Sequence, residues 1–438
     1  MNDAELWNSA VEVLRANALG GWTKPAPALY PHQWSWDSAF IAIGLVRVDP
    51  PRAVRELETL FAAQWLDGRV PHIVFNADAA ASDYFPDPGW WGSQDFSPPA
   101  PTGIATSGLV QPPVHAIAAW HIAQVAGEPV RDRLGALYPK LVAWHRYLAS
   151  RRDPDGRGLI RVYHSWESMD NSPRFDAALA RVQVGELPPY QRRDTAHVED
   201  RSQRPSDAEY DRFLWLVQLL KAAGYDDAQA QRSLPLLMAD VFFSAVFAAA
   251  NHALSDLGEW LGVGADRAEL DSWARRYSAA VQGQWDATDG LALDVDLRAG
   301  SPIHVQTCAG LSPLLVPGLD AALCDELIGT LFGPRFAGAP GFKYRVIPSA
   351  APGSPGFNSR SYWRGPVWPV VNWLFWWALR QQGKARCAEE LRQANLQLLR
   401  APTSRFAEYL EPYTGEPLGS MDQSWTAAVA LDWLALPT

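Results

Sequence analysis

An all-α fold is predicted for this chain, with the helices arranged in a closed double ring. Apolar residues recur at helical spacing through most of the sequence, whereas convincing strands are few. Neighbouring helices also contrast: residues 367–379 (VWPVVNWLFWWAL) are apolar nearly all round, but residues 384–399 carry Arg, Glu and Gln on one face. The first kind of helix is buried on all sides and the second on one. Inner helices followed by outer ones form an (α/α) barrel.

The expected helices follow one another through short links, and several carry start and stop residues. Ser206, with Glu209 three residues later, forms a capping box. Pro366 is expected in the first turn of a later helix, and Gly383 ends that helix. In chain order, the spacing predicts helices near residues 4–18, 37–47, 52–66, 107–127, 131–151, 206–223, 241–260, 265–283, 319–332, 365–382, 384–400 and 421–435.

Four longer loops interrupt this rhythm, at residues 68–105, 153–205, 284–310 and 334–363. Loops longer than about 15 residues in a compact domain are usually functional. Residues 83–103, rich in Asp, Pro, Gly and Trp, resemble a lid, and residues 186–205 are polar and expected to be mobile. No linker divides the chain, so one domain over residues 1–438 is predicted.

Composition and charge argue against several classes of protein. The 438 residues carry a formal net charge of −10 at pH 7, without a visible cluster of Lys and Arg. Nucleic-acid grooves and anionic membrane surfaces call for such clusters, so neither partner is expected. Cys308, Cys324 and Cys387 are widely spaced and contain no CxxC pair, which supports neither a disulfide framework nor a zinc site.

Two further observations concern location. The first residues, Met-Asn-Asp-Ala-Glu-Leu-Trp, lack the basic and apolar regions of a signal peptide. The longest apolar stretch includes Asn372 and is shorter than the roughly 20 residues that a membrane span needs. A cytoplasmic protein is therefore expected.

Aromatic and acidic residues recur together where loops meet helices. The runs are YPHQWSWD at 30–37, WESMDNSP at 166–173, YWRGPVW at 362–368, EYLEPYTG at 408–415 and DQSW at 422–425. Indole faces cover the apolar faces of sugar rings, and two well-placed carboxylic acids can break a glycosidic bond. The pattern predicts a carbohydrate site.

The first run ends on Asp37, at the start of an apolar helix. An N-cap role is the plain alternative for this residue. Together with Tyr30, Gln33, Trp34 and Trp36, a carboxylate at the mouth of an inner helix favours a ligand for sugar hydroxyls.

Asp170 lies in the second run, among residues that favour a turn. A turn and a catalytic role are compatible, because such a loop can present an acid from a rigid frame. Burial beside Trp166, with a second carboxylate nearby, would raise the pKa of Asp170 and make it a general acid. Glu167 is the rival for this role.

Glu408 and Glu411 lie in a polar segment before the last helix, where an exposed pair of acids is the default interpretation. Their position resembles that of the other runs, so one of them is the expected base. Arg364 opens the most apolar helix and is interpreted equally as a structural ion pair or a ligand. Arg204 is expected to be exposed and available to an anionic substrate.

No metal or nucleotide site is supported by the remaining motifs. His72 and His115 lie among apolar residues, where hydrogen-bonded core histidines are commoner than ligands, and no HExxH pattern occurs. Gly156 and Gly158 form a turn, because no GxGxxG or Walker sequence follows a strand. A serine-nucleophile elbow is likewise absent.

Taken together, these motifs resemble glycoside hydrolase family 63, and within it the small bacterial hydrolases that act on mannosylglycerate and glucosylglycerate. The resemblance extends over the whole chain. It rests on HQWSWDSAF at 32–40, SWESMDNSPRFD at 165–176, RPSDAEY at 204–210, SYWRGPVWPVVNW at 361–373 and EYLEPYTGEPLGSMDQSWTAA at 408–428.

The resemblance implies an (α/α)6 barrel, anomeric inversion, no metal or organic cofactor, Asp170 as general acid and Glu408 as general base. The resemblance favours Glu408 over Glu411, because in related trehalase-like and glucosidase patterns the basic Glu lies four residues before the Pro of a Pro-x-Thr-Gly turn, as Glu408 does here. Arg204, Tyr210, Tyr362 and Trp363 would attract a glycerate carboxylate. The expected substrate-binding residues are Tyr30, Gln33, Trp34, Trp36, Asp37, His72, Gln111, Trp166, Arg204, Tyr210, Tyr362, Trp363, Arg364, Gly365, Trp368 and Gln423.

Two alternatives stay open at this point. One is an enzyme of the same fold with a neutral substrate, such as a trehalase-like or oligosaccharide α-glucosidase. The other is a sugar-binding protein without catalytic activity. Glucose and mannose are both compatible with the sequence, because these sugars differ only in the orientation of the 2-hydroxyl.

Overall fold

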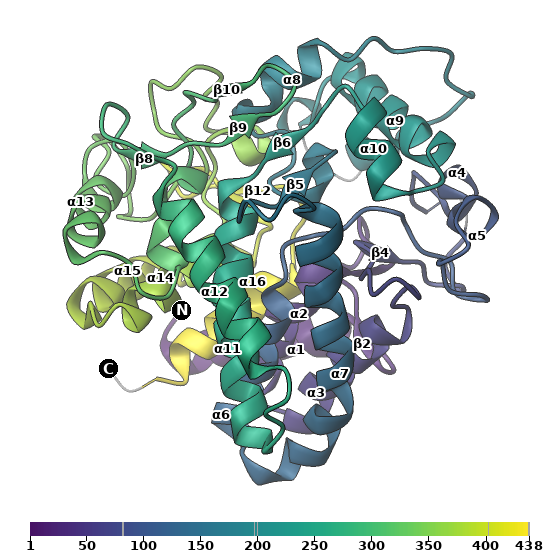
Figure 1. The fold of residues 1–438 in the computed structure, drawn as a ribbon. Coiled ribbons are helices and arrows are strands. Elements are labelled where there is room, and N and C mark those ends of the chain that lie inside the picture. The colour runs from purple at the N-terminus through teal and green to yellow at the C-terminus, as the bar shows by residue number, and fades with distance from the viewer. Residues whose placement is uncertain (81–82, 197, 199, 402, 437–438) are drawn as a thin grey trace.

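The computed structural model describes residues 1–80, 83–196, 198, 200–401 and 403–436, and helices dominate it (Figure 1). Residues 81–82 of the predicted loop 68–105 lie outside the described residues. The same holds for residues 197 and 199 of the segment 186–205 that was expected to be mobile.

The long helices agree with the predicted ranges, each of which overlaps one of them. The capping box of Ser206 and Glu209 is present at the start of α9. The long helices are α1 (Asp3–Ala16), α2 (Ser35–Leu45), α3 (Pro50–Ala62), α6 (Val114–Ala126), α7 (Arg131–Tyr147), α9 (Asp207–Ala222), α11 (Val241–Leu261), α12 (Arg267–Gln282), α13 (Ala321–Phe332), α14 (Pro369–Gln381), α15 (Ala385–Leu399) and α16 (Ser424–Leu434).

Prolines move two helix starts away from the predicted positions. The range 107–127 becomes helical only at Val114, after two consecutive prolines that disfavour helical backbone before them. In the range 365–382, Pro369 and not Pro366 occupies the first helical turn. The backbone of Val367 instead exchanges hydrogen bonds of 2.8 and 2.9 Å with Leu410. The segments directly before both helices are therefore not part of them.

Short helical segments occur inside the predicted loops. The predicted lid contains α4 (Pro88–Trp91) and α5 (Ser93–Phe96), and the indoles of Trp90 and Trp91 are buried. Further segments are α8 (Asp176–Ala180), α10 (Asp227–Ser233) and the 3-10 helix η7 (Cys308–Leu315). Each is too short for a helical apolar period to show in the sequence.

Each strand is two residues long, and every pairing between these strands is antiparallel. The largest sheet has the order β10-β9-β6-β5 and joins distant loops. The strands are β1 (Ala18–Leu19) with β2 (Trp22–Thr23), β3 (Gln33–Trp34) with β4 (Ile73–Val74), β5 (Arg161–Val162), β6 (Met238–Ala239), β9 (Val295–Asp296) and β10 (Ser301–Pro302), β7 (Trp285–Asp286) with β8 (Leu291–Ala292), and β11 (Tyr409–Leu410) with β12 (Pro417–Leu418).

Largely buried segments contact one another in a closed sequence. The order is α2, α6, α11, η7, α14, α16 and again α2. Amphipathic helices pack against them: α3 on α2, α7 on α6, α12 on α11, α13 on η7, α15 on α14 and α1 on α16. The expected contrast between 367–379 and 384–399 is confirmed, because α14 is buried nearly all round and α15 on one side.

The buried helices α2 and α16 approach each other closely at Gly44. A Cβ atom built on Gly44 of α2 would lie 2.3 Å from the backbone of Ala428 in α16. Only glycine permits this separation, since real Cβ atoms do not approach backbone so closely. The tight contact fixes the two helices whose N-terminal ends carry the first and last sequence runs.

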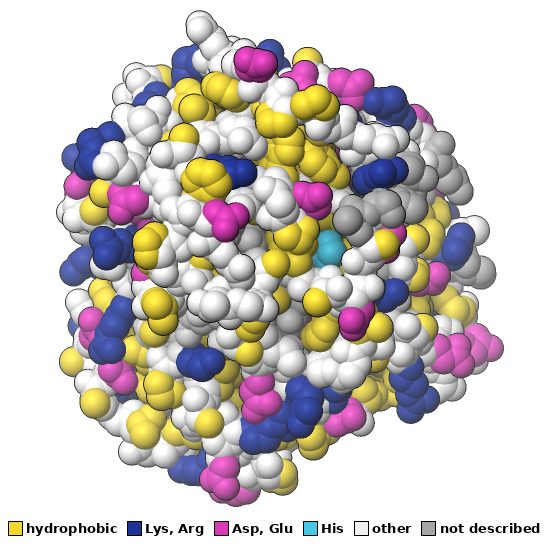
Figure 2. Space-filling view, turned by 90° about the vertical axis from the view of Figure 1, so that its right-hand side faces the viewer, with side chains coloured by type: hydrophobic (Ala, Val, Ile, Leu, Met, Phe, Trp, Pro, Cys, Tyr) yellow, Lys and Arg dark blue, Asp and Glu magenta, His cyan; other side chains and the backbone are white. Residues whose placement is uncertain are grey.

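The outer face shows mixed charge. On the face drawn in Figure 2, acidic and basic side chains are interspersed without a large patch of Lys and Arg. No helix within the described ranges is long and apolar enough to cross a membrane.

Candidate active site

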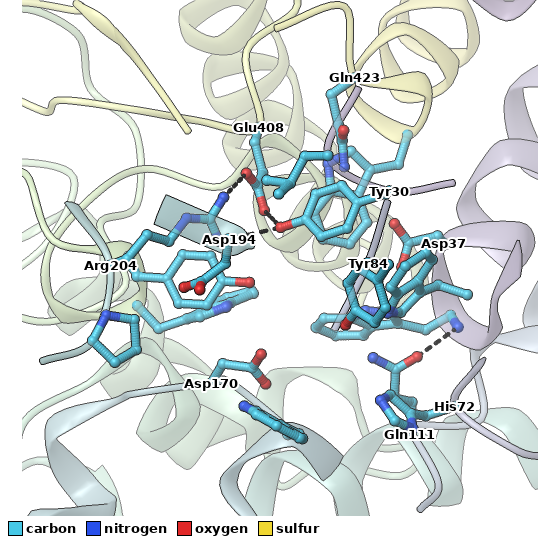
Figure 3. A pocket seen from close by; sticks show the side chains of 18 of the residues that line it. Tyr30, Asp37, His72, Tyr84, Gln111, Asp170, Asp194, Arg204, Glu408 and Gln423 are labelled. Carbon is cyan, nitrogen blue, oxygen red and sulfur yellow. Dashed lines mark hydrogen bonds and ion pairs between the residues drawn. The ribbon is translucent and has the colours of Figure 1, made fainter. Parts of the chain in front are cut away.

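A cavity lies at the N-terminal ends of α2, α6 and α16 (Figure 3). Its lining combines indoles, phenols and carboxylates from segments far apart in the sequence. The lining residues are Leu29, Tyr30, Trp34, Trp36, Asp37, His72, Tyr84, Phe85, Gln111, Trp166, Asp170, Asp194, Arg204, Pro205, Tyr210, Tyr362, Trp363, Glu408, Gln423 and Trp425.

One side of the cavity is formed by the start of α2. Trp34 is the N-cap of this helix and makes no side-chain cap bond, so Asp37 is not the cap residue. The Asp37 carboxyl is 5% exposed and faces the cavity (Figure 3). Burial raises its pKa well above the usual range, and the charges of Glu408 and Asp170 raise it further.

Gln111 and His72 lie on the same side as Asp37. The Gln111 Oε1 atom accepts a hydrogen bond of 3.2 Å from the Trp36 N–H, and its amide nitrogen points into the cavity (Figure 3). Burial holds the pKa of His72 well below its usual value, so the imidazole is neutral. Its Nδ1 atom lies 2.5 Å from the Ser107 hydroxyl. This side therefore offers neutral and acidic groups that suit sugar hydroxyls.

Asp170 projects into the cavity from a turn on the opposite side to Glu408 (Figure 3). The turn lies between the 3-10 helices η3 (Ser165–Glu167) and η4 (Pro173–Phe175). Burial raises the pKa of Asp170 well above its usual range; Arg204 opposes this shift and Glu408 adds to it. A carboxyl in this environment retains its proton at a higher pH than a free aspartate does.

Glu408 precedes β11 and is 2% exposed. Its Oε1 atom accepts a bond of 2.6 Å from the Tyr30 hydroxyl, and its Oε2 atom accepts bonds from Arg204 (2.9 Å) and the Ser420 N–H (3.0 Å). Gly419 leaves room for this carboxylate, because a Cβ there would lie 2.5 Å from Oε2. Three donors thus hold one carboxylate at the cavity wall.

The sequence predicted that Arg204 is exposed, and this prediction was wrong. Its side chain is 4% exposed and forms an ion pair with Glu408, and a second bond of 3.2 Å reaches the Tyr30 hydroxyl. The guanidinium also lies 4.6 Å from the centre of the Tyr362 ring. A buried guanidinium requires a carboxylate partner, which comes from a segment 204 residues later in the chain.

The two rival carboxylates do not line the cavity. Glu167 is completely buried and accepts bonds of 2.7 and 3.0 Å from Arg152, together with the N–H groups of Tyr163 and Val110. Glu411 accepts the N–H and hydroxyl of Thr414, within the turn that follows it. Both carboxylates stabilise local structure.

Four residues expected to bind substrate lie outside the cavity lining. The Gln33 amide donates to the Ser38 hydroxyl at 3.0 Å and to the Glu56 carbonyl, on the side facing α3. Trp368 stacks behind Trp363, with ring centres 3.8 Å apart. Arg364 binds Asp176, and the N–H of Gly365 donates to the Ser349 hydroxyl. Trp368 thus contacts a residue of the lining, whereas these partners of Gln33, Arg364 and Gly365 do not line the cavity.

Leu29, Tyr84, Phe85, Asp194, Pro205 and Trp425 also line the cavity but were not among the expected substrate-binding residues, although Trp425 stands in the run DQSW at 422–425. Tyr84 and Phe85 belong to the predicted lid, and the Phe85 ring stacks on Tyr190 at 5.5 Å. Asp194, from the predicted mobile segment, forms a bidentate pair with Arg192 at 3.0 and 2.7 Å. The available signal was the length of the two loops, which singled out the segments but not the residues.

No group of three or more His, Cys, Asp or Glu side chains is arranged for a metal ion in the part of the chain that the structure describes. The arrangement instead provides two carboxyls with raised pKa values, Asp37 and Asp170, one carboxylate held by three donors, and several indoles in the lining. Such a cavity can bind a sugar and transfer protons on both sides of it.

The helical scaffold and the cavity lined by indoles and carboxyls indicate a glycoside hydrolase. Comparison with known proteins supports the same class. The chain is 48% identical to the glucosylglycerate hydrolase of Mycolicibacterium hassiacum, over 97% of this chain and 96% of the relative. It is 41% identical to the mannosylglycerate hydrolase of Thermus thermophilus, over 97% and 99%.

The crystal structure of a GH63 mannosylglycerate hydrolase from Thermus thermophilus, in complex with Tris and D-glycerate, has the same fold. The TM-score is 0.89 at 41% identity, and the similarity covers 98% of this chain and 99% of that one. The mannosylglycerate hydrolase MGH1-like glycoside hydrolase domain matches residues 30–426. The chain belongs to this family.

Proposed function

We propose that the protein hydrolyses glucosylglycerate, mannosylglycerate or both, with inversion at the anomeric carbon. The carrying observation is the pair Asp170 and Glu408, which face the cavity from opposite sides (Figure 3). The raised pKa of Asp170 suits a general acid. Glu408 accepts three hydrogen bonds, as an ionised carboxylate does, and this suits a general base.

In the proposed reaction, the bond between the anomeric carbon and the glycerate oxygen breaks, and both electrons go to that oxygen. Asp170 transfers its proton to the same oxygen. A water molecule forms the new bond from the opposite face and gives a proton to Glu408. One water is consumed, and hexose and glycerate are released. An inverting pair needs about 6.5 to 9.5 Å between its carboxyl groups to leave room for that water.

The glycone is assigned to the side that carries Trp36, Asp37 and Gln111. The Asp37 carboxyl faces the cavity, which places its oxygens within reach of sugar hydroxyls bound there. The amide nitrogen of Gln111 adds a donor. Indole faces of Trp34 and Trp36 cover the ring. Trp166 and Gln423 also line the cavity.

The glycerate is assigned to the side that carries Arg204. This guanidinium supplies positive charge in a cavity with several carboxylates, and the phenols of Tyr210 and Tyr362 lie on the same lining. Burial raises the pKa of both phenols, so they stay protonated; the Tyr210 hydroxyl donates to the Phe85 carbonyl at 3.1 Å. The substrates in the names of the relatives, glucosylglycerate and mannosylglycerate, both contain an acidic leaving group of this kind.

We propose further that the scaffold is an (α/α)6 barrel within one domain. The support is the closed sequence of contacts among α2, α6, α11, η7, α14 and α16, with one amphipathic helix on each. The 3-10 helix η7 would occupy one inner position.

The function is tested by incubating the protein with glucosylglycerate, mannosylglycerate and trehalose and following the products by NMR. We expect hexose from one or both glycerate glycosides, first as the β-anomer. Asp170→Asn and Glu408→Gln should each reduce the rate by about 10² to 10⁴. Release from trehalose alone would assign a neutral substrate, and first release of the α-anomer would exclude inversion.

A further inference from the structure

Asp170 lies at a turn corner whose conformation depends on the next residue. The Ser172 N–H donates to the Met169 carbonyl at 3.2 Å, which closes a turn with Asp170 and Asn171 at its two central positions. Asn171 has a φ of 54°, in the left-handed region that side chains other than glycine seldom adopt. Such a turn requires positive φ at its third residue, so the orientation of Asp170 is tied to the Asn171 backbone.

Arg364 is the residue that holds this backbone. Its Nη1 atom donates to the Asn171 carbonyl at 3.1 Å. The same guanidinium forms two bonds with Asp176, of 2.9 and 2.6 Å, and its Nε donates to the Gly356 carbonyl at 3.1 Å. The Arg364 side chain is 14% exposed, so solvent does little to weaken these bonds. One planar group thus ties both ends of the segment from Asn171 to Asp176.

The same guanidinium connects two walls of the cavity. Arg364 ends the 3-10 helix η8 (Tyr362–Arg364), and the two preceding residues, Tyr362 and Trp363, line the cavity. The bonds from Arg364 to Asn171 and Asp176 cross from this wall to the wall that bears Asp170. The separation of the two walls therefore depends on a side chain that does not line the cavity itself.

We propose that Arg364 is a positioning residue for the proton transfer by Asp170. This inference rests on the proposed role of Asp170 as general acid. Without Arg364, the turn loses its anchor at Asn171, and the carboxyl no longer points steadily at the leaving oxygen. A displacement of about 1 Å in a reacting group can reduce a rate by about 10². The base Glu408 is held by Tyr30, Arg204 and Ser420 and not by Arg364, so of the two catalytic carboxyls only Asp170 sits on a turn that loses an anchor.

A substrate whose leaving group needs no proton tests whether Arg364 acts on the proton transfer or only on the stability of the fold. Loss of a positioning role should slow only the substrate that needs the proton. α-Glucosyl fluoride reacts with water when fluoride leaves with the electron pair of its bond to carbon, and Glu408 still takes the proton of the water. We expect Arg364→Met to lower kcat/KM for the glycerate glycoside about 10²-fold. Fluoride release, followed with an ion-selective electrode, should change by less than about threefold.

Two further variants keep the test decisive. Asp176→Asn weakens the same ion pair from its carboxylate side. The Asp176 side chain is 44% exposed, so this variant can replace Arg364→Met if the latter does not fold. Arg364→Lys should lose less than Arg364→Met, because a single ammonium cannot bind Asp176 and the Asn171 carbonyl in one plane but still supplies a charged donor. We expect both variants to show the same selective loss on the glycerate glycoside.

Arg133→Met is the matched control. Arg133 also makes two bonds to a carboxylate, Glu58 at 2.9 and 2.5 Å, and one to a carbonyl, Pro51 at 2.8 Å, but it joins α7 to α3 away from the cavity lining. It should lower the melting temperature without changing either rate selectively. Equal loss on both substrates in Arg364→Met, or loss on neither, would overturn the positioning role.

Asp170→Asn distinguishes failure of this inference from failure of the proposed function. If Asp170 is the acid, its variant retains fluoride release and loses glycerate glycoside hydrolysis by about 10² to 10⁴. An Asp170→Asn protein that hydrolyses both substrates normally would refute the proposed acid itself. A selective Asp170→Asn combined with an unselective Arg364→Met would refute only the positioning role.

Discussion

Replacing Arg204 by Met tests whether the buried guanidinium has two tasks. In the structure it binds Glu408 at 2.9 Å, and the proposed function assigns it to the leaving-group carboxylate as well. Removing it therefore disturbs the base for every substrate and removes an anchor only for acidic ones. We expect glucosylglycerate hydrolysis to fall further than hydrolysis of glucosylglycerol, which has the same leaving group without the carboxylate.

The size of the difference follows from the bonds involved. A hydrogen bond to a charged group contributes about 1.5 to 3 kcal/mol, which corresponds to a factor of about 10 to 150 in kcat/KM. This factor is the expected extra loss for glucosylglycerate over glucosylglycerol. Both partners of the ion pair are less than 5% exposed, so the variant should also lose about 3 to 5 kcal/mol of unfolding free energy.

The assay compares kcat/KM for the two substrates in the wild type, Arg204→Met and Tyr30→Phe. Tyr30 also binds Glu408, at 2.6 Å, but carries no positive charge. Its variant should therefore reduce both rates by similar factors, which measures the contribution of base support alone. Urea unfolding shows whether each variant is folded. Equal losses on both substrates in Arg204→Met would refute the contact between Arg204 and the leaving group.

Three further predictions address the acid, the scaffold and the rival carboxylate. Activity requires protonated Asp170, so kcat/KM should fall as the pH rises through its raised pKa, and Asp170→Asn should abolish this alkaline limb in a pH profile; an unchanged limb would contradict the assignment. Gly44→Ala should lower the unfolding free energy by about 1 to 3 kcal/mol in urea, because its Cβ meets the backbone of α16. Gly135→Ala, in nearly open space on α7, should instead stabilise by about 0.5 to 1 kcal/mol, and a loss there as large as that of Gly44→Ala would remove the packing explanation. Glu167→Leu leaves Arg152 buried with weaker pairing and should cost about 3 to 5 kcal/mol; a change below about 1 kcal/mol would show that the pair does not stabilise the fold.

The helices could be predicted because their signal is local. An apolar face at helical spacing is contained within a dozen residues, as in α15, and does not depend on the rest of the chain. The errors lie where that signal is weak or overridden. Pro369, rather than Pro366, starts α14, and the wholly buried η7 was missed because eight residues are too few to show a helical apolar period. The closure of the contacts around η7 could not be seen from any one segment.

Much of the site could also be predicted, because the residues that line it stand in short runs beside helix starts. Tyr30, Trp36, Asp37 and Gln423 were all identified in this way, and all line the cavity. The exceptions are residues whose neighbours come from distant parts of the chain. Asp194, in a loop without a distinctive motif, shows no local sign of facing the cavity.

The sequence by itself determined which kinds of groups this protein brings to its cavity: indoles for a sugar ring, and carboxylates placed where loops meet buried helices. Only the tertiary structure decided which carboxylates face the cavity. Glu167 is three residues from Asp170, yet Glu167 forms a buried ion pair with Arg152, whereas Asp170 lines the cavity. Arg204 and Arg364 similarly bind carboxylates that lie 204 and 188 residues away in the sequence. The physical reason is that the state of an ionisable side chain depends on the charges and solvent around it, and folding brings these from the whole chain.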